Sequence, residues 1–397
     1  MPVMLVIGLP KRHTLALLLV TLSLAASGFY VVLTGRAITD GVVVKVTAAT
    51  VLALLPLLPV GWLLYKGYAL HVLRAVAWGI IANSLWGAYQ LYSFSRNTFP
   101  MIWIYQNPSY GDFIQNLEVE WALYVKRAFG FFPEPSAMSA SIGPWLVLMV
   151  GLLMYPGLLD GITAKTKALL WAALIFGLAL IMTSQSGFML PLMASLLVVA
   201  LPMLFRLLNR AYRPGNMLLL VILGVSGVVL AIIAVSYLGD RLDFQNDSWQ
   251  QRGQSILWGI FYLGTDPGVF LFGVGPGQSY EMLSQAGGGE TLSSGSAVWS
   301  VTVNHLQEQG LAGGLALLAV FGIMVNAIIR SGSRMVGIAC LLAWSAGVIL
   351  TTSYTSLSPI WLFMGALRLW DHLFAPSSAK KDEDPHRNVE IRRKAGV

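Results

Sequence analysis

Apolar residues fill this chain in repeated runs of helix length, separated by short polar or charged segments. A run of about 20 apolar residues is long enough to cross a bilayer as a helix. These runs also lack the period-two alternation of membrane barrel strands. The pattern predicts an all-α polytopic membrane bundle of about ten transmembrane helices. The expected helices lie near residues 14–34, 42–65, 70–93, 137–158, 168–184, 188–208, 216–237, 306–329, 335–352 and 355–374.

Composition agrees with this class of protein. Hydrophobic residues make up 56% of the 397 residues and charged residues only 11%, a balance that no soluble domain requires. The single cysteine, Cys340, excludes an intrachain disulfide and a Cys-based metal cluster. The net charge of +7 follows from basic cytoplasmic loops, so we expect no nucleic-acid partner. We interpret the first apolar run, after Lys11-Arg12, as an uncleaved span.

Basic residues mark alternate loops between the predicted helices. They include Lys11, Arg12, Lys66, Arg74, Lys165, Lys167, Arg206, Arg210, Arg213, Arg330 and Arg334. Because cytoplasmic loops are enriched in Lys and Arg, we expect both termini in the cytoplasm. Two long segments, 94–136 and 238–305, then lie outside the membrane as large loops. Residues 1–376 form the transmembrane domain in this interpretation, and residues 377–397 form a charged cytoplasmic tail.

Several cations lie on the expected outer side, where the charge rule does not account for them. Arg127 follows Lys126 directly, and Arg241 and Arg252 fall in the second long segment. A guanidinium binds phosphate oxygens in a planar, bidentate manner, so these residues are candidates to bind a diphosphate. The alternatives are contact with lipid headgroups or structural ion pairs, for example with Glu134.

A glycine-rich segment, Gly273-Val274-Gly275-Pro276-Gly277-Gln278, is the second candidate element. Glycine tolerates backbone conformations closed to other residues and lets backbone amides approach a ligand. We therefore take Gly275 and Gln278 as candidate substrate-binding residues. The segment is not a dinucleotide fingerprint, which has another glycine spacing and a following helix. A tight turn without a ligand is the alternative.

The start of the eighth predicted helix carries His305 and Glu308. Residues three apart share a helix face, and a histidine beside a carboxylate is suited to accept a hydroxyl proton. Alternatively, Glu308 caps the helix and His305 lies among lipid headgroups. A polar turn, Thr183 to Gly187, separates the fifth and sixth predicted helices, and it is either functional or a simple hairpin turn.

Taken in order, these motifs resemble the O-antigen polymerase and ligase superfamily of bacterial envelope polysaccharide synthesis. The resemblance covers residues 120–330. Its motifs correspond here to Arg127, Gly130 and Glu134-Pro135-Ser136, to Thr183–Gly187, to Arg241, Arg252 and Trp258, to Phe272–Gly277, and to Glu308, Gly310 and Gly313. Ligase-type members often carry a His about nine residues before the final Glu, where this chain has Trp299. The difference favours a Wzy-type polymerase over a WaaL-type ligase.

The resemblance implies a glycosyltransferase in the bacterial inner membrane with its active site facing the periplasm. Its donor would be an oligosaccharide on undecaprenyl diphosphate, and a chain-length regulator of the same pathway is a further candidate partner. Arg127, Lys126, Arg241 and Arg252 would bind the diphosphate. Glu134, Glu308 or His305 would accept the proton of the acceptor hydroxyl. We find no outer metal-ligand pattern and no nucleotide-binding loop, so we expect no metal and no cofactor.

Three alternatives remain open from the sequence. An O-antigen ligase would transfer finished glycan to the lipid A core. A flippase or transporter would have the same hydropathy but should carry charges within the membrane, often with inverted repeats. A structural partner of a synthesis complex would use its arginines only to contact headgroups.

Overall fold

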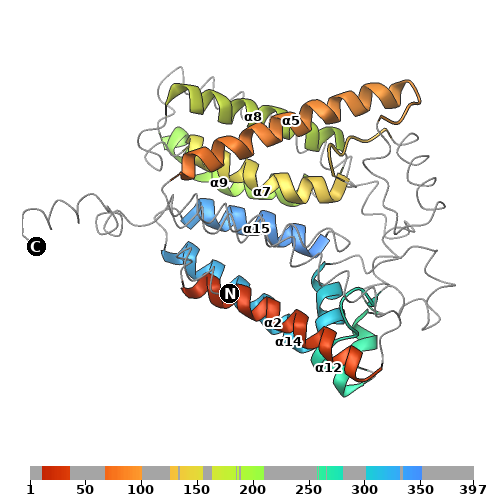
Figure 1. Ribbon diagram of the computed structural model, residues 1–397. Helices are drawn as coiled ribbons and strands as arrows, with labels where there is room; N and C mark the ends of the chain where they lie inside the picture. The colour runs from red at the N-terminus through yellow and green to blue at the C-terminus, as the bar shows by residue number, and fades with distance from the viewer. Residues whose placement is uncertain are drawn as a thin grey trace, which may run out of the picture.

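The computed structural model describes residues 11–35, 68–100, 126–132, 135–154, 163–184, 186, 189–209, 257, 259–264, 266–279, 301–330 and 334–350. These residues are helical or lie in turns and loops, and none of them forms a strand. The helices are α2 (Lys11–Leu33), α5 (Ala69–Ser95), α7 (Pro135–Met154), α8 (Ala164–Ser184), α9 (Met189–Asn209), α12 (Pro267–Phe272), α14 (Val301–Arg330) and α15 (Arg334–Leu350). The seven long helices lie side by side, and the short α12 packs near one end (Figure 1).

The seven long helices coincide with seven of the predicted segments, so their helical state is confirmed. The largest difference is at α14, which begins at Val301 rather than near 306. The predicted segment 238–305 also contains the helix α12. The predicted helices 42–65, 216–237 and 355–374 and the tail 377–397 lie outside the described residues.

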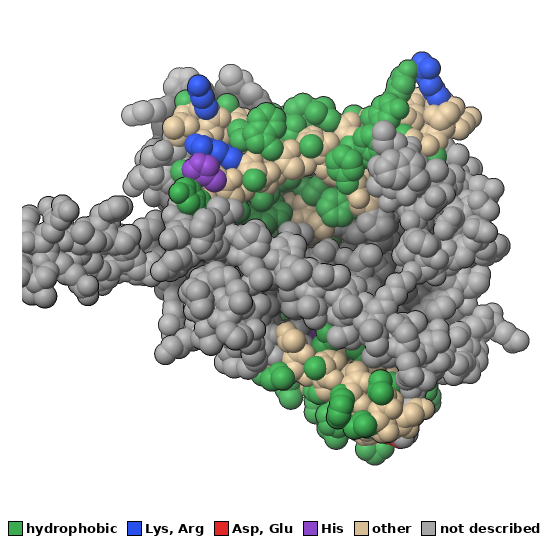
Figure 2. Space-filling model, viewed as in Figure 1, with side chains coloured by type: hydrophobic (Ala, Val, Ile, Leu, Met, Phe, Trp, Pro, Cys, Tyr) green, Lys and Arg blue, Asp and Glu red, His purple; other side chains and the backbone are tan. Residues whose placement is uncertain are grey.

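Two helices of the described part are long and apolar enough to cross a membrane, at Ala164–Ser184 and Thr302–Ile323. Three shorter apolar helical segments accompany them, at Thr21–Leu33, Met138–Met154 and Pro191–Ala200. Large hydrophobic side chains such as Trp78, Ile175 and Leu318 are more than half exposed. On the face shown in Figure 2, hydrophobic side chains are spread along the described helices, and the Lys and Arg side chains lie near helix ends.

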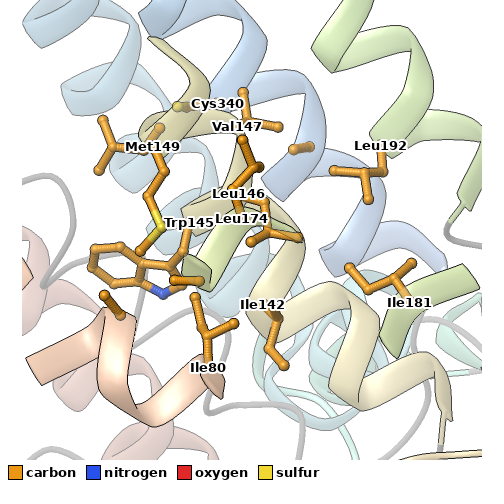
Figure 3. Packing of buried hydrophobic residues seen from close by; sticks show 14 of the residues in the cluster. Ile80, Ile142, Trp145, Leu146, Val147, Met149, Leu174, Ile181, Leu192 and Cys340 are labelled. Atoms are coloured by element: carbon orange, nitrogen blue, oxygen red, sulfur yellow. The ribbon is translucent and has the colours of Figure 1, made fainter. Parts of the chain in front are cut away.

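Helix α7 forms the centre of the bundle and contacts α8, α9 and α15. The backbone of Pro135 suits the first position of this helix because proline has no N–H to leave unpaired there. Buried side chains from α5, α7, α8, α9 and α15 interdigitate around Trp145 and Leu146 (Figure 3). Helix α14 joins this core through Ala316 and Leu317 and also contacts α2 and α12.

Polar contacts at the helix ends establish the relative directions of the central helices. The Arg74 Nε–H donates to Thr166 Oγ1 at 2.9 Å, so the beginnings of α5 and α8 lie together. Ser139 Oγ lies 3.3 Å from Ser184 Oγ, which places the beginning of α7 beside the end of α8. The bundle therefore has two distinct ends, one of which carries the end of α5, the beginning of α7 and the end of α8.

We predict that a leucine at Gly177 destabilises the bundle. A Cβ atom there would lie 2.7 Å from Leu146 Cδ2 and 2.9 Å from Ile80 Cγ2, and overfilling a packed core costs about 1–3 kcal/mol. Cys340 is the only cysteine and is buried, so its reaction with a thiol-specific dye on heating reports unfolding. Gly79→Leu is the control because nothing lies within 4 Å of its Cβ position. Equal unfolding temperatures for the two variants would contradict this packing.

Candidate functional site

The loop that follows α12 lies directly against a break in α14. The Val274 N–H donates to the Gln307 carbonyl oxygen at 2.9 Å, and the Gly275 N–H donates to the Glu308 carbonyl oxygen at 3.0 Å. In an unbroken helix these carbonyls would accept from the amides four residues further on. The two glycine-rich motifs, more than 30 residues apart in the sequence, are thus joined through their backbones.

Gly310 forms the break in α14, with φ 61° and ψ −157°. This left-handed φ strongly favours glycine, and space imposes a second requirement. A Cβ atom on Gly310 would lie 2.5 Å from the Gly273 nitrogen and 2.6 Å from the Leu271 oxygen. A Cβ atom on Gly273 would in turn overlap the Glu308 carbonyl group. The loop and the helix can approach this closely only because both positions are glycine.

The side-chain carboxyl group of Glu308 also forms hydrogen bonds with this loop. It is 2% exposed, and its Oε1 accepts from the Ser279 hydroxyl at 2.8 Å. The backbone amides of Gly277 and Ser279 and the side chain of Asn304 also donate to it. A carboxylate offers roughly four lone-pair positions, so these four donors occupy its oxygens. In this arrangement Glu308 joins the loop to α14 and does not cap the beginning of the helix.

A chain of hydrogen bonds links α2 to His305. The Ser23 hydroxyl donates to Gln309 Oε1 at 2.7 Å, and Gln309 Nε2 lies 3.0 Å from His305 Nδ1. All three side chains are buried. The sequence suggested a carboxylate beside His305, but its partner is the carboxamide of Gln309 instead. A second serine of α2, Ser27, donates from its hydroxyl to the Glu308 carbonyl oxygen.

Several buried polar atoms at the beginning of α14 have no hydrogen-bond partner within the described part of the chain. They are Asn304 Oδ1, His305 Nε2 and both polar atoms of the Gln307 carboxamide. Buried polar groups are normally hydrogen-bonded, and the exceptions tend to reflect function or a bound solvent molecule or ion. This part of α14 therefore has hydrogen-bonding capacity that the described residues do not use, at Asn304, His305 and Gln307.

The segment 126–132, with Lys126 and Arg127, is held against α5 by one glutamine. Gln90 Oε1 accepts from the amides of Phe129 and Gly130 at 3.2 and 2.9 Å, and Gln90 Nε2 donates to the Gly130 carbonyl at 2.9 Å. Lys126 has φ 51° and is exposed, whereas Arg127 is half-buried. The glutamine thus fixes the backbone next to the two cations.

Aromatic packing and a second amide side chain support the same segment. Asn83 Oδ1 accepts from the Phe131 amide at 2.7 Å, and the Phe131 ring stacks on Trp86 with centroids 5.4 Å apart. The Phe129 ring packs with Phe94 and Phe99. Gly130 has φ 63°, and a Cβ atom there would overlap the Asn83 side chain. The glycine is therefore required both by its conformation and by its contact with α5.

Two serines of the polar segment between α8 and α9, Ser184 and Ser186, belong to the described residues. Ser184 ends α8, its hydroxyl donates to the Ile181 carbonyl, and its Oγ lies near Ser139 of α7. The Met189 amide, at the start of α9, donates to the Ser186 carbonyl at 3.0 Å. Both serines are buried. Ser184 thus lies beside the beginning of α7, whose first two residues are Pro135 and Ser136 of the Glu134-Pro135-Ser136 motif.

The structure brings together four of the residues predicted from the sequence: His305, Glu308, Gly275 and Gln278. The Gly275 amide donates to the Glu308 carbonyl oxygen and so contributes to docking the loop, whereas Gln278 is fully buried and its amide donates to the Gly275 carbonyl oxygen within the loop. Lys126 and Arg127 lie together in the segment held by α5. Glu134, Arg241 and Arg252 are outside the described residues, as is Trp258.

Four supporting residues were not identified from the sequence: Ser23, Ser27, Asn83 and Gln90. Each pair carries a weak signal, because residues four or seven apart in a helix share a face. Ser23 and Ser27 are polar positions four apart in the first apolar run, and Asn83 and Gln90 are polar positions seven apart in the third. A polar pair on one face of a predicted span indicates a polar partner, but the sequence does not say which.

Among the residues that the structure describes, no group of three or more His, Cys, Asp or Glu side chains is placed to hold a metal ion. In comparisons with known proteins, no family model matches the chain, and no curated protein or solved structure is significantly similar to it.

We predict that Gly310→Ala is strongly destabilising. An alanine there combines a left-handed φ with overlap against the backbone of Leu271 and Gly273, and conformational strain of this kind alone costs on the order of 1–3 kcal/mol. The measurement is the unfolding temperature reported by the Cys340 thiol. Gly322→Ala, in the same helix with nothing within 4 Å of its Cβ position, should be neutral or slightly stabilising. A Gly310→Ala protein as stable as the Gly322→Ala protein would show that the break is not required.

Proposed function

We propose that this protein is a membrane glycosyltransferase that polymerises oligosaccharide repeats carried on undecaprenyl diphosphate. The observation that carries the proposal is the docking of the Phe272–Gly277 loop onto the Glu308–Gly313 segment. Both motifs belong to the set that resembles the polymerase and ligase superfamily, and they pack around buried polar side chains. Such an arrangement is expected of a site and not of a simple turn.

The proposed membrane arrangement has ten spans, both termini in the cytoplasm and the site at the periplasmic face of the bacterial inner membrane. Three features support it: the apolar helices, the exposed hydrophobic side chains along them, and the pairing of helix ends. Arg74, near the beginning of α5, contacts Thr166 at the beginning of α8, and Thr166 lies between Lys165 and Lys167. These cations belong to the proposed cytoplasmic end, and residues 126–132 to the opposite end.

In the proposed reaction, a hydroxyl oxygen of the acceptor sugar attacks the anomeric carbon of the donor sugar. The bond from that carbon to the diphosphate oxygen breaks, its electron pair stays on the diphosphate, and the hydroxyl proton passes to a carboxylate. Arg127, Arg241 and Arg252, with Lys126, bind the diphosphate and stabilise the charge that develops on it. The fixed backbone around Gly130 supports a defined position for Arg127 and Lys126.

We assign the proton acceptor to Glu134 and not to Glu308. The four donors on the Glu308 carboxyl group leave it little capacity to accept a further hydrogen bond. Glu134 lies between two prolines, which restrict its backbone, and it follows the segment that carries Arg127. The assignment places the proton acceptor and the diphosphate-binding cations on neighbouring stretches of the chain.

Transport is a second candidate, and one observation favours it. Discontinuous helices with polar groups at the break form the substrate sites of many transporters, and α14 is broken beside buried polar residues. Purified protein supplied only with lipid-linked repeat distinguishes the two functions. Polymer formation in detergent requires a transferase, whereas a transporter would leave the repeat unchanged.

The proposed orientation predicts which exposed positions are reached from each side of the membrane. In a Cys340→Ala background, Ser95→Cys should react with a membrane-impermeant maleimide added from the periplasm, and Lys165→Cys only after the membrane is opened. Both side chains are exposed, so burial does not limit either reaction. The reversed pattern would overturn the orientation and the location of the site.

The assignment of the two carboxylates predicts opposite behaviour of two matched variants. Glu134→Gln should lower the transfer rate by about two to four orders of magnitude, the usual contribution of general acid–base catalysis, with little change in unfolding temperature. Glu308→Gln places an NH₂ group among hydrogen-bond donors, so its main effect should be a lower unfolding temperature. Chelator should not inhibit the parent protein. Normal turnover in Glu134→Gln, or loss of turnover with chelator, would contradict the proposed chemistry.

A further inference from the structure

The hydrogen bonds from Ser23 through Gln309 to His305 bear on which ring nitrogen of the histidine carries hydrogen. The Ser23 hydroxyl donates to Gln309 Oε1, and the carboxamide nitrogen of Gln309 faces His305 Nδ1 at 3.0 Å. A carboxamide nitrogen can only donate. The Nδ1 atom must therefore be the acceptor, and it carries no hydrogen.

A neutral imidazole with an unprotonated Nδ1 carries its hydrogen on Nε2. The Nε2 atom of His305 is buried and has no partner among the described residues. Ser23 and Gln309 are buried as well, so water does not readily replace the contact between Gln309 and His305. The Nε2 atom of His305 is thus a hydrogen-bond donor, which differs from the proton-accepting role suggested by the sequence.

We propose that Ser23 and Gln309 are positioning residues that hold His305 as the Nε2–H tautomer, so that its Nε2–H donates to an oxygen of the substrate. The inferred tautomer rests on the orientation of the Gln309 carboxamide, whose nitrogen faces His305 Nδ1. The identity of the substrate rests on the proposed function, in which the available acceptors are diphosphate oxygens and sugar oxygens. A donor in this position stabilises negative charge without itself taking a proton.

Nuclear magnetic resonance tests the tautomer directly. The full-length protein, labelled with ¹⁵N-histidine in detergent micelles, contains five histidines, and His305→Asn assigns the relevant signals. Two-bond ¹H–¹⁵N correlations should show hydrogen on Nε2 and a lone pair on Nδ1. Hydrogen on Nδ1 in the parent protein would overturn the proposal, whatever the variants do.

Two substitutions test whether the hydrogen bonds from Ser23 through Gln309 set the His305 tautomer. Gln309→Glu presents a carboxylate, which accepts only, so the hydrogen should move to Nδ1 and the tautomer should reverse. Ser23→Ala removes the group that orients the carboxamide, and both tautomers should appear. Ser195→Ala is the matched control, since this buried serine of α9 donates to the Pro191 carbonyl within its own helix. An unchanged Nε2–H tautomer in Gln309→Glu would show that Gln309 does not set it.

Ligand titration separates the two possible acceptors. A shift of the Nε2 signal with undecaprenyl diphosphate alone indicates a diphosphate oxygen. A shift only with undecaprenyl diphosphate that carries a sugar indicates a sugar oxygen, and no shift with either would overturn the donor role. Failure of polymer formation alongside the expected tautomer and shift would reject the proposed function while leaving this inference intact.

Discussion

The break in α14 at Gly310 is the constraint on which the candidate site depends. An α-helix that crosses an apolar environment must satisfy its own backbone groups, because each unsatisfied group costs several kcal/mol. At the break, the carbonyls of Gln307 and Glu308 are instead satisfied by the loop after α12. The loop can reach them only because Gly273 and Gly310 carry no side chain. Loop position, helix geometry and the burial of Glu308 are therefore consequences of one backbone junction.

A similar principle holds the segment that carries Lys126 and Arg127. There a single buried side chain, Gln90, forms hydrogen bonds with the amides of Phe129 and Gly130 and with the Gly130 carbonyl. In both places a polar residue on a largely apolar helix pairs with loop backbone across the bundle. Removing such a residue would leave several backbone groups unpaired at once, which is costly in a buried setting.

Much of the helical architecture was predictable from the hydrophobic pattern. Seven apolar runs correspond to α2, α5, α7, α8, α9, α14 and α15, because length and continuous apolarity are strong signals. The contact between the glycine loop and α14 was not predictable in the same way. It depends on the conformation of Gly310 and on Ser23 and Ser27, which in the sequence are ordinary small residues of an apolar run.

The partners of His305 and Glu308 show why spacing alone was insufficient. Residues three apart share a helix face, which suggested that these two side chains interact. In the structure the loop supplies donors to Glu308, and Gln309, four residues after His305, contacts its ring. Spacing identified the correct helix and the correct polar residues, but tertiary contacts decided their pairing. The roles of Glu134, Arg241 and Arg252 remain predictions from sequence.

A double-mutant cycle on Ser279 and Glu308 tests most directly whether loop and helix form one unit. The free energy of unfolding in mixed detergent micelles would be measured for the parent, Ser279→Ala, Glu308→Gln and the double variant, with the Cys340 thiol as reporter. Directly contacting residues show coupling of about 0.5–3 kcal/mol. We expect coupling in this range, since the Ser279 hydroxyl donates to Glu308 Oε1 at 2.8 Å. Additive effects of the two substitutions would contradict the docking of the loop on α14.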